Sequence, residues 1–154
     1  MLFLKSVLFT IVIPGTVAVY LPWLLFARTP DANFGFVRYA GIPLFAIGAA
    51  IYAWCVADFA LAGRGTPAPI DPPKELVVRG LYRHVRNPMY IGVGLVLLGE
   101  AFWFQKTRMV LYSAIVAVVW HLFVVFYEEP VLQRKFGESY RKYREEVPRW
   151  LPRA

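Results

Sequence analysis

The residues best suited to chemistry lie in one stretch, residues 80–92, which reads GLYRHVRNPMYIG. It joins two arginines, a histidine, an asparagine and two tyrosines to the start of a long apolar run. Arginine can bind a carboxylate or a phosphate, histidine and asparagine can hydrogen-bond a polar ligand, and tyrosine rings can pack on flat groups. A basic and aromatic anchor at a membrane interface is the simpler interpretation. The Asn-Pro pair and the following glycines fit an anchor less well than a binding site.

A second polar segment, residues 128–148, begins with the acidic pair Glu128 and Glu129. Their carboxylates can accept hydrogen bonds from a ligand, or they could simply begin a surface helix. Arg134 could hold a carboxylate substrate and so have a catalytic role. Apolar and aromatic residues recur here at spacings of three and four, which is typical of an amphipathic helix; they are Leu132, Phe136, Tyr140, Tyr143 and Val147. We expect that helix to lie on the membrane surface, with its tyrosines as packing residues.

Four apolar runs, residues 2–26, 37–61, 88–104 and 109–127, occupy most of the chain. Of the 154 residues, 58% are hydrophobic and 18% are charged, and long stretches carry no charge. A membrane-spanning helix needs about 20 apolar residues. We therefore predict an all-α polytopic membrane protein with about four transmembrane helices and a C-terminal amphipathic interfacial helix. It forms a single domain, residues 1–154, in which residues 1–62 supply two N-terminal spans.

Several residues within the runs have predictable structural roles. Pro14 and Gly15 should kink the first run. Small residues in the second and third runs should let those helices approach closely; they include Gly41, Gly48, Gly92, Gly94 and Gly99. Asp58 could reach the interface or face a polar cavity, and we favour the interface. Asn87 can cap the third helix, and Pro88 suits its first turn.

The composition argues against several other kinds of protein. The net charge of +7 could indicate nucleic-acid binding, but the basic residues lie between the apolar runs, where membrane topology explains them. The single cysteine, Cys55, cannot form a disulfide within the chain. Two histidines, His84 and His121, are too few for a self-contained histidine metal cluster, so no metal site is expected.

The distribution of basic residues predicts the orientation in the membrane. If the chain has four spans, one side of the membrane holds the N-terminus, residues 63–87 and the C-terminal tail. These segments carry thirteen of the 17 lysines and arginines. The opposite side holds the remaining four, Arg28, Arg38, Lys106 and Arg108. The positive-inside rule therefore places the termini and both polar segments in the cytoplasm.

The two polar segments should meet in space. They flank the third and fourth runs, and a helical hairpin brings its two ends to the same membrane face. His121 precedes Glu128 by seven residues, so the two lie on roughly one helix face. We interpret His121 mainly as a hydrogen bonder in helix packing, although it could also act as a base. Carboxylates, arginines and aromatic rings would then converge on one interfacial pocket.

The same residues resemble those of a known superfamily. The sequence RNPMYIG at 86–92, the pair Glu128-Glu129, FGESYRKY at 136–143 and Val147-Pro148 resemble the isoprenylcysteine carboxyl methyltransferase and phospholipid methyltransferase superfamily. The resemblance covers residues 76–152. It implies an integral membrane methyltransferase that uses S-adenosylmethionine, with residues 76–152 as its cofactor-binding core.

The resemblance also implies which residues form the site. Cofactor-binding residues would be His84, Arg86, Asn87, Pro88, Tyr90, Gly92, Glu128 and Glu129. From their chemistry rather than from the resemblance, we expect Glu129 and Arg134 to be catalytic. Arg83, Arg86 or Arg134 could pair with the cofactor carboxylate. Many relatives have histidine where this chain has Asn87, and an asparagine cannot titrate.

The expected reaction is methyl transfer to an amphiphilic or lipid acceptor reached from the bilayer, in the cytoplasmic membrane of a prokaryote. The leading acceptor is a carboxylate of the isoprenylcysteine type. The alternative is the amine of a phospholipid head group, which would need a base such as Glu129 or His121. A rival of another class is a non-catalytic membrane scaffold or a small transporter component. A transporter would favour polar residues near the bilayer midplane. Apart from His121, the polar residues gather at one interface, which favours the enzyme.

Overall fold

The computed structural model describes residues 12–29, 31–62 and 76–152, which form helices joined by short turns and contain no strand. The longer helices are α2 (Leu21–Phe26), α3 (Gly41–Ala62), α4 (Pro88–Trp103), α5 (Thr107–Phe123), α6 (Glu129–Phe136) and α7 (Glu138–Glu146). Short π-helical turns precede α2 and α6, at Thr16–Tyr20 and Val124–Glu128, and 3₁₀ turns lie at Gly35–Ala40 and Gly80–Arg83. The predicted all-α class is confirmed.

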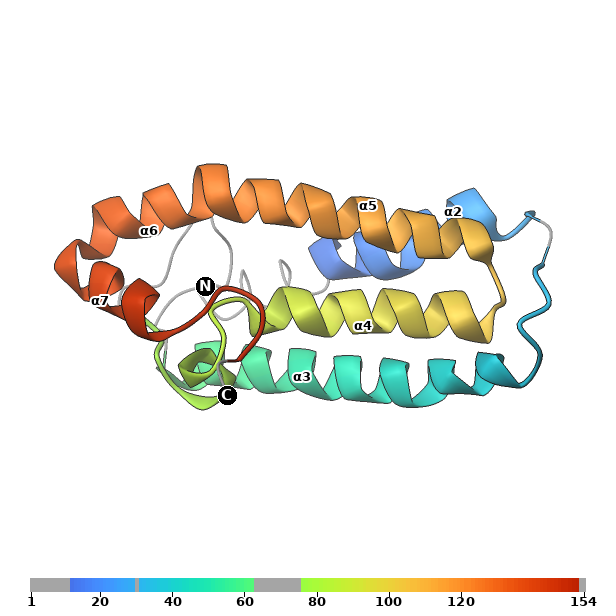
Figure 1. Cartoon of the computed structure of the whole chain (residues 1–154), viewed down its shortest axis with the longest axis horizontal. Coiled ribbons are helices and arrows are strands. Elements are labelled where there is room, and N and C mark those ends of the chain that lie inside the picture. Colours follow the sequence, from blue (N-terminus) through green and yellow to red (C-terminus); the bar gives the residue numbers. More distant parts are fainter. Residues whose placement is uncertain (1–11, 30, 63–75, 153–154) are drawn as a thin grey trace.

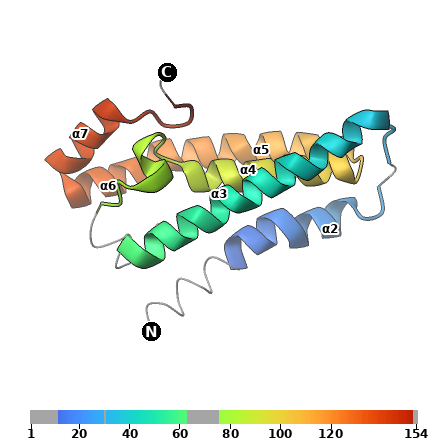
Figure 2. The ribbon, with the colours of Figure 1, turned by 90° about the horizontal axis from the view of Figure 1, so that it is seen from below.

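The helices α3, α4 and α5 lie side by side with nearly parallel axes, and α2 runs along the same bundle (Figures 1 and 2). Helix α6 continues the line of α5, and α7 turns back beneath it. The last described residues then cross to the start of α4 (Figure 1). The polar segment before α4 and the polar segment after α5 therefore meet at one end of the bundle.

Glycines bring α3 and α4 into close contact. A Cβ atom placed on Gly48 would lie 2.5 Å from the carbonyl oxygen of Gly92, and one on Gly41 would lie 2.5 Å from that of Gly99. These distances leave no room for a side chain, so both helix crossings require glycine. The predicted close approach is confirmed for these four residues, whereas a Cβ on Gly94 would meet nothing within 4 Å.

Two described helices are long and apolar enough to cross a membrane, Gly35–Phe59 and Thr107–Phe136. Two further apolar helices, Val12–Phe26 and Pro88–Trp103, are shorter. The 16 residues of α4 rise about 24 Å, which is less than the ~30 Å hydrocarbon layer. Large apolar side chains such as Trp23, Leu111 and Phe126 are exposed on the bundle surface, as contact with lipid requires. These features indicate a membrane protein, and two of its described helices are long enough to span a bilayer, so the predicted number of four spans is not confirmed.

Prolines widen two of the helices. Each π-helical turn ends two residues before a proline, Pro22 in α2 and Pro130 in α6. A proline lacks the amide hydrogen and its ring clashes with the carbonyl four residues earlier. The backbone N–H of Glu129 accordingly donates to the carbonyl of Val124, five residues back. Pro14 and Gly15 are helical and directly precede the turn that begins at Thr16, and the kink expected there stays a prediction.

The C-terminal region differs from the single surface helix that the sequence predicts. Helix α6 continues α5 through the π-helical turn, so it belongs to the long helix rather than to a separate one. Gly137, with φ at +53°, ends α6 and reverses the chain into α7. The apolar stripe itself is confirmed, since Tyr140, Tyr143 and Val147 are buried together and pack against Leu132, Phe136 and Leu76.

Asp58 does not reach the interface as expected. Its side chain is buried near the end of α3 and pairs with Arg79, whose Nε atom lies 3.2 Å from Oδ1. Its other oxygen, Oδ2, is packed against Gly80, where a Cβ atom would collide with it. Asp58 therefore finds its partner, Arg79, in the segment that precedes the 3₁₀ turn and not within α3.

Candidate functional site

A cavity of about 550 Å³ lies where the start of α4 faces the junction of α5 and α6. Its volume is typical of a small-molecule or cofactor site. Its polar wall is formed by Tyr82, Arg86, Asn87, Tyr90 and Glu128. Most of the remaining wall is apolar or aromatic; it includes Ile13, Val17, Phe59, Met89, Val93, Trp120 and Phe123. The two polar segments that the sequence singles out therefore share one cavity, as predicted.

Glu128 and Tyr90 join the two sides of the cavity. The hydroxyl of Tyr90 in α4 donates a hydrogen bond of 2.9 Å to Oε2 of Glu128. Among the described lining residues, Glu128 is the sole carboxylate. The ring of Tyr90 also packs against Trp120 of α5, with ring centroids 5.3 Å apart. The carboxylate of Glu128 is thereby held in a fixed position at the cavity wall.

Asn87 and Pro88 begin α4, but not by the capping bond expected of Asn87. Pro88 is fully buried in the first turn, where its missing N–H is not needed. The side chain of Asn87 makes no capping bond and instead donates from Nδ2 to the carbonyl oxygen of Arg149, at 3.2 Å. The predicted side-chain cap is therefore wrong: a cap needs Oδ1 to accept from the first turn of the helix, whereas the side chain here is bonded through Nδ2 to the returning C-terminal segment.

Arg86 forms an ion pair through one nitrogen of its guanidinium, while another, Nε, has no partner among the described residues. Its side chain is 10% exposed and lines the cavity, and its Nη1 atom lies 2.9 Å from Oε1 of Glu129. Its Nε atom is buried and has no hydrogen-bond partner within the part of the chain that the structure describes. A buried donor without a partner is costly, so this atom is suited to an anionic ligand group.

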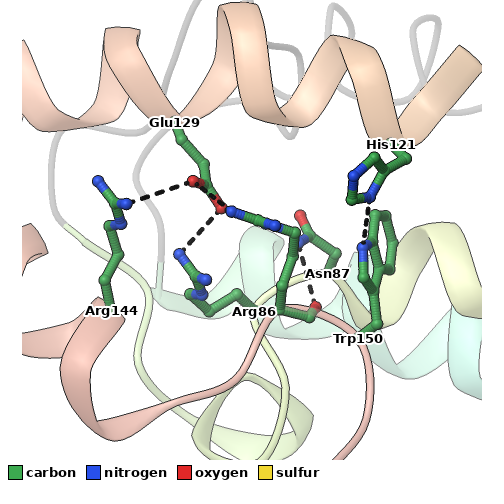
Figure 3. Close-up of polar contacts among 7 residues, drawn as sticks. Arg86, Asn87, His121, Glu129, Arg144 and Trp150 are labelled. Carbon is green, nitrogen blue, oxygen red and sulfur yellow. Dashed lines mark hydrogen bonds and ion pairs between the residues drawn. The ribbon is translucent and has the colours of Figure 1, made fainter.

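Glu129 is turned away from the cavity and holds three arginines (Figure 3). Arg149 binds it twice, from Nε at 2.7 Å and from Nη2 at 3.0 Å. Arg86 lies 2.9 Å away and Arg144 of α7 lies 3.8 Å away. Successive helix residues point about 100° apart, which is why Glu128 and Glu129 have different surroundings. Glu129 thus fastens the start of α4, α7 and the C-terminal segment to α6.

The C-terminal segment closes over this end of the bundle. The backbone N–H of Arg86 donates to the carbonyl oxygen of Pro148 at 2.9 Å. The indole N–H of Trp150 donates to Nδ1 of His121 at 3.0 Å, and the two rings lie 6.1 Å apart (Figure 3). The ring of Trp150 also meets that of Tyr90 edge to face, at 6.4 Å. His121 is thus a hydrogen bonder, as interpreted, although its partner is the C-terminal segment rather than a neighbouring helix.

Two tyrosines of α7 support the site without entering it. The hydroxyl of Tyr143 donates to the carbonyl oxygen of Tyr82 at 2.7 Å, which ties α7 to the 3₁₀ turn before α4. Burial raises the pKa of Tyr140 to about 12, and burial likewise raises the pKa of Tyr143 above its ordinary value. Both phenols therefore stay protonated at neutral pH, and the packing role expected of them is confirmed.

Five of the predicted site residues lie away from the cavity wall, namely Pro88 and Glu129, described above, and three more. His84 is exposed at the end of the 3₁₀ turn, and Arg134 is exposed on α6. Gly92 packs against Gly48 of α3, so its position serves helix contact. Sequence reasoning missed Arg149 and Trp150, although the pair directly follows the Val147-Pro148 motif, and it also missed Trp120 as a cavity residue.

The fold and the cavity together define a class, a helical membrane protein with a polar-walled pocket between its helices. Residues 36–139, more than half of the chain, match the family described as phospholipid methyltransferase. The chain therefore belongs to this family, and it is a methyltransferase.

Curated relatives agree with that assignment. The chain is 34% identical over 79 residues to protein-S-isoprenylcysteine O-methyltransferase of Schizosaccharomyces pombe. The aligned segment covers 50% of this chain and 33% of that protein. It is 29% identical over 140 residues to a probable protein-S-isoprenylcysteine O-methyltransferase of Oryza sativa, covering 84% of this chain and 67% of that protein. An uncharacterized protein of Haemophilus influenzae is 36% identical over 63 residues, which is 41% of this chain and 100% of that protein. No solved structure matches.

Proposed function

We propose that this methyltransferase transfers a methyl group from S-adenosylmethionine to a lipid-like acceptor, as an isoprenylcysteine carboxyl O-methyltransferase does. The observation that carries the proposal is that Arg86, whose buried Nε has no partner among the described residues, and the carboxylate-bearing Glu128 line the same cavity. Both residues belong to the motifs that resemble the superfamily, and both come from the region that matches the methyltransferase family.

The residues at the cavity fit this cofactor. Its amino-acid head carries a carboxylate, for which the unpartnered Nε of Arg86 is a suitable donor. Its ribose diol or its ammonium can donate to Glu128, which keeps acceptor capacity beside the bond from Tyr90. Aromatic and apolar side chains near them can pack on the adenine. When bound, the cofactor supplies a methyl group already activated by a sulfonium.

The protein therefore has little covalent chemistry to perform. An acceptor oxygen forms a bond to the methyl carbon as the bond from that carbon to sulfur breaks, and the electron pair remains on sulfur. The residues of the cavity bind, align and dehydrate the reactants. Glu128 is the carboxylate that meets a ligand in this proposal. Glu129, held by three arginines, positions the walls instead, and Arg134 would have to act from outside the cavity.

The acceptor is proposed to be amphiphilic. The apolar part of the wall extends from Val93 of α4 to Val17 near α2 and Phe123 of α5, and it offers an acyl or prenyl chain an apolar surface next to the polar groups. A carboxylate acceptor is already a nucleophile at neutral pH and needs no base. Relatives named as isoprenylcysteine O-methyltransferases favour this class.

A phospholipid amine is the second candidate. The family description points to it, and Glu128 could remove the proton that an amine must lose. His121 and Glu129 are less suited to that role, since neither lines the cavity.

The proposal includes a place in the cell. The thirteen-to-four distribution of lysine and arginine puts both termini and the cavity on the cytoplasmic side, in the cytoplasmic membrane of a prokaryote. Soluble S-adenosylmethionine would reach the cavity from that side, and the lipid acceptor would reach it from the bilayer.

Calorimetric titration of the detergent-purified protein with S-adenosylmethionine and S-adenosylhomocysteine tests the cofactor. We expect saturable binding of both, with loss of affinity in Glu128→Gln and little change in Arg134→Gln. Incorporation of labelled methyl groups into a prenylcysteine or into phosphatidylethanolamine then separates the two acceptors. Folded protein that binds neither compound would overturn the proposal.

A further inference from the structure

The ring of Trp150 lies directly behind the cavity wall. It meets Tyr90 edge to face at 6.4 Å, and Tyr90 in turn donates to Glu128 at 2.9 Å. The indole N–H is fixed by His121 at 3.0 Å. Trp150 itself is not part of the cavity lining. It is therefore placed to act on a ligand only through Tyr90.

We propose that residues 147–150 form a clasp over the polar side of the cofactor cavity, with Trp150 as the positioning residue that holds Tyr90 and Glu128 in place. The clasp rests on the function proposed above, because it concerns the exchange of a ligand in that same cavity. It assigns a role to two residues, His121 and Trp150, that the methyl-transfer chemistry leaves unused.

The clasp is held firmly at its beginning. Val147 is buried in the cluster around α7, and the carbonyl oxygen of Pro148 accepts from the backbone of Arg86. Arg149 binds Glu129 through two charge-assisted hydrogen bonds, and its carbonyl oxygen accepts from Asn87. Opening this part would expose buried charge, so we expect it to stay in place.

The end of the clasp is held weakly. The bond between Trp150 and His121 lies at the surface of the bundle, and a single hydrogen bond stabilises by only about 1 kcal/mol. Its ring contact with Tyr90 adds an amount of the same order. The contacts of Trp150 are therefore weak enough to break and re-form during ligand exchange, while Arg149 keeps the segment close to the site.

The position of the clasp matches the route of a polar ligand. Arg86, Asn87 and Tyr90 form the polar wall, and each of them contacts the clasp. The opposite wall is apolar and faces α2 and α3. A charged cofactor should exchange through the polar wall, so release of Trp150 would limit its departure.

The test measures how fast S-adenosylhomocysteine leaves the detergent-purified full chain. We expect Trp150→Ala to raise the dissociation rate about tenfold, which corresponds to ~1.4 kcal/mol. Trp150→Phe keeps a ring against Tyr90 but lacks the indole N–H, and it should recover part of the slow rate. His121→Leu should resemble Trp150→Phe, because both lose the same hydrogen bond. Trp23→Ala, which changes an exposed tryptophan of α2, is the matched control and should release the ligand at the wild-type rate.

A second measurement does not depend on the dissociation rate. Trypsin cleavage after Arg149 should be slow in the wild type, slower still with S-adenosylhomocysteine, and faster in Trp150→Ala. The wild type could bind S-adenosylhomocysteine while Trp150→Ala shows the wild-type rates of ligand release and trypsin cleavage. That result would overturn the clasp and leave the proposed function intact. Failure of the folded wild type to bind S-adenosylhomocysteine would overturn both.

Discussion

Two regions of the bundle, its polar end and the contact of α3 with α4, are held together by different interactions. At the polar end, a buried carboxylate, three arginines and a returning chain segment join α4, α6 and α7. Along α3 and α4, by contrast, glycines let backbone meet backbone at Gly41–Gly99 and Gly48–Gly92. Charged contacts can be rearranged when a ligand binds, whereas glycine contacts admit one geometry. The molecule thus combines a rigid helix pair with a polar end that can respond to a cofactor.

The largest expected effect comes from the rigid helix pair. Gly48→Leu would force a side chain into the space occupied by the backbone of Gly92 and Val96, so the helices must separate. We expect a loss of about 3 kcal/mol or more in the free energy of unfolding, or a failure to fold. Thermal unfolding in detergent measures it. Gly94→Leu is the matched control, since a Cβ there meets nothing within 4 Å, and equal damage in both variants would contradict the glycine contact.

The next effect concerns the carboxylate at the polar end. Glu129→Gln keeps the size of the side chain but removes the charge that faces Arg86, Arg144 and Arg149. We expect a loss of about 2 kcal/mol of stability, because Arg86 is nearly buried. Glu138→Gln, which breaks the exposed pair with Arg141, should change stability by less than about 1 kcal/mol. Chemical denaturation measures the stability of both variants. Equal denaturation midpoints would show that the ion pairs of Glu129 stabilise the protein no more than the surface pair of Glu138 does.

A smaller effect separates ligand binding from stability. Tyr90→Phe removes the hydroxyl that donates to Glu128 and keeps the ring against Trp120. We expect a cost near 1 kcal/mol in stability and weaker binding of S-adenosylhomocysteine in the calorimeter. Tyr112→Phe loses a comparable bond, to the carbonyl oxygen of Val17, and should keep ligand affinity if the polar end alone binds the cofactor.

The smallest effect appears only at high pH. The pKa of Tyr140 is raised to about 12 in the folded chain, whereas an unfolded tyrosine titrates near 10. The unfolded state therefore releases its proton first, and stability should fall as the pH rises above about 10. Tyr140→Phe should flatten this decline, as followed by circular dichroism between pH 9 and 12. An unchanged slope would place the alkaline sensitivity elsewhere.

Much of the fold follows from the sequence because it depends on regular patterns. The apolar runs predict the helices, the small residues predict the contact of α3 with α4, and spacings of three and four predict the cluster of Tyr140, Tyr143 and Val147. The meeting of the two polar segments also follows, because the ends of a helical hairpin share one side.

What the sequence misses depends on contacts between distant segments. Asp58 finds Arg79, and Asn87 finds the carbonyl of Arg149, only after the chain has folded back. Glu128 and Glu129 are identical in type and adjacent in sequence, so no pattern separates the residue that faces the cavity from the one that binds arginines. The continuity of α5 and α6 was obscured by Pro130, which usually ends a helix but here follows a widened turn.

That widened turn, Val124–Glu128, also determines where the gene tolerates a change of length. A π-helical turn takes up one additional residue without rotating the helix beyond it. Loss of one codon there would restore a regular α-helical turn, at the cost of the proline clash that the widened turn avoids, and would leave Glu128 facing the cavity. Loss of one codon in the regular part of α5 would instead rotate everything that follows by about 100° and carry both carboxylates away from their partners. The turn is thus the one stretch of the long helix where we expect an in-frame deletion to spare the register of the site.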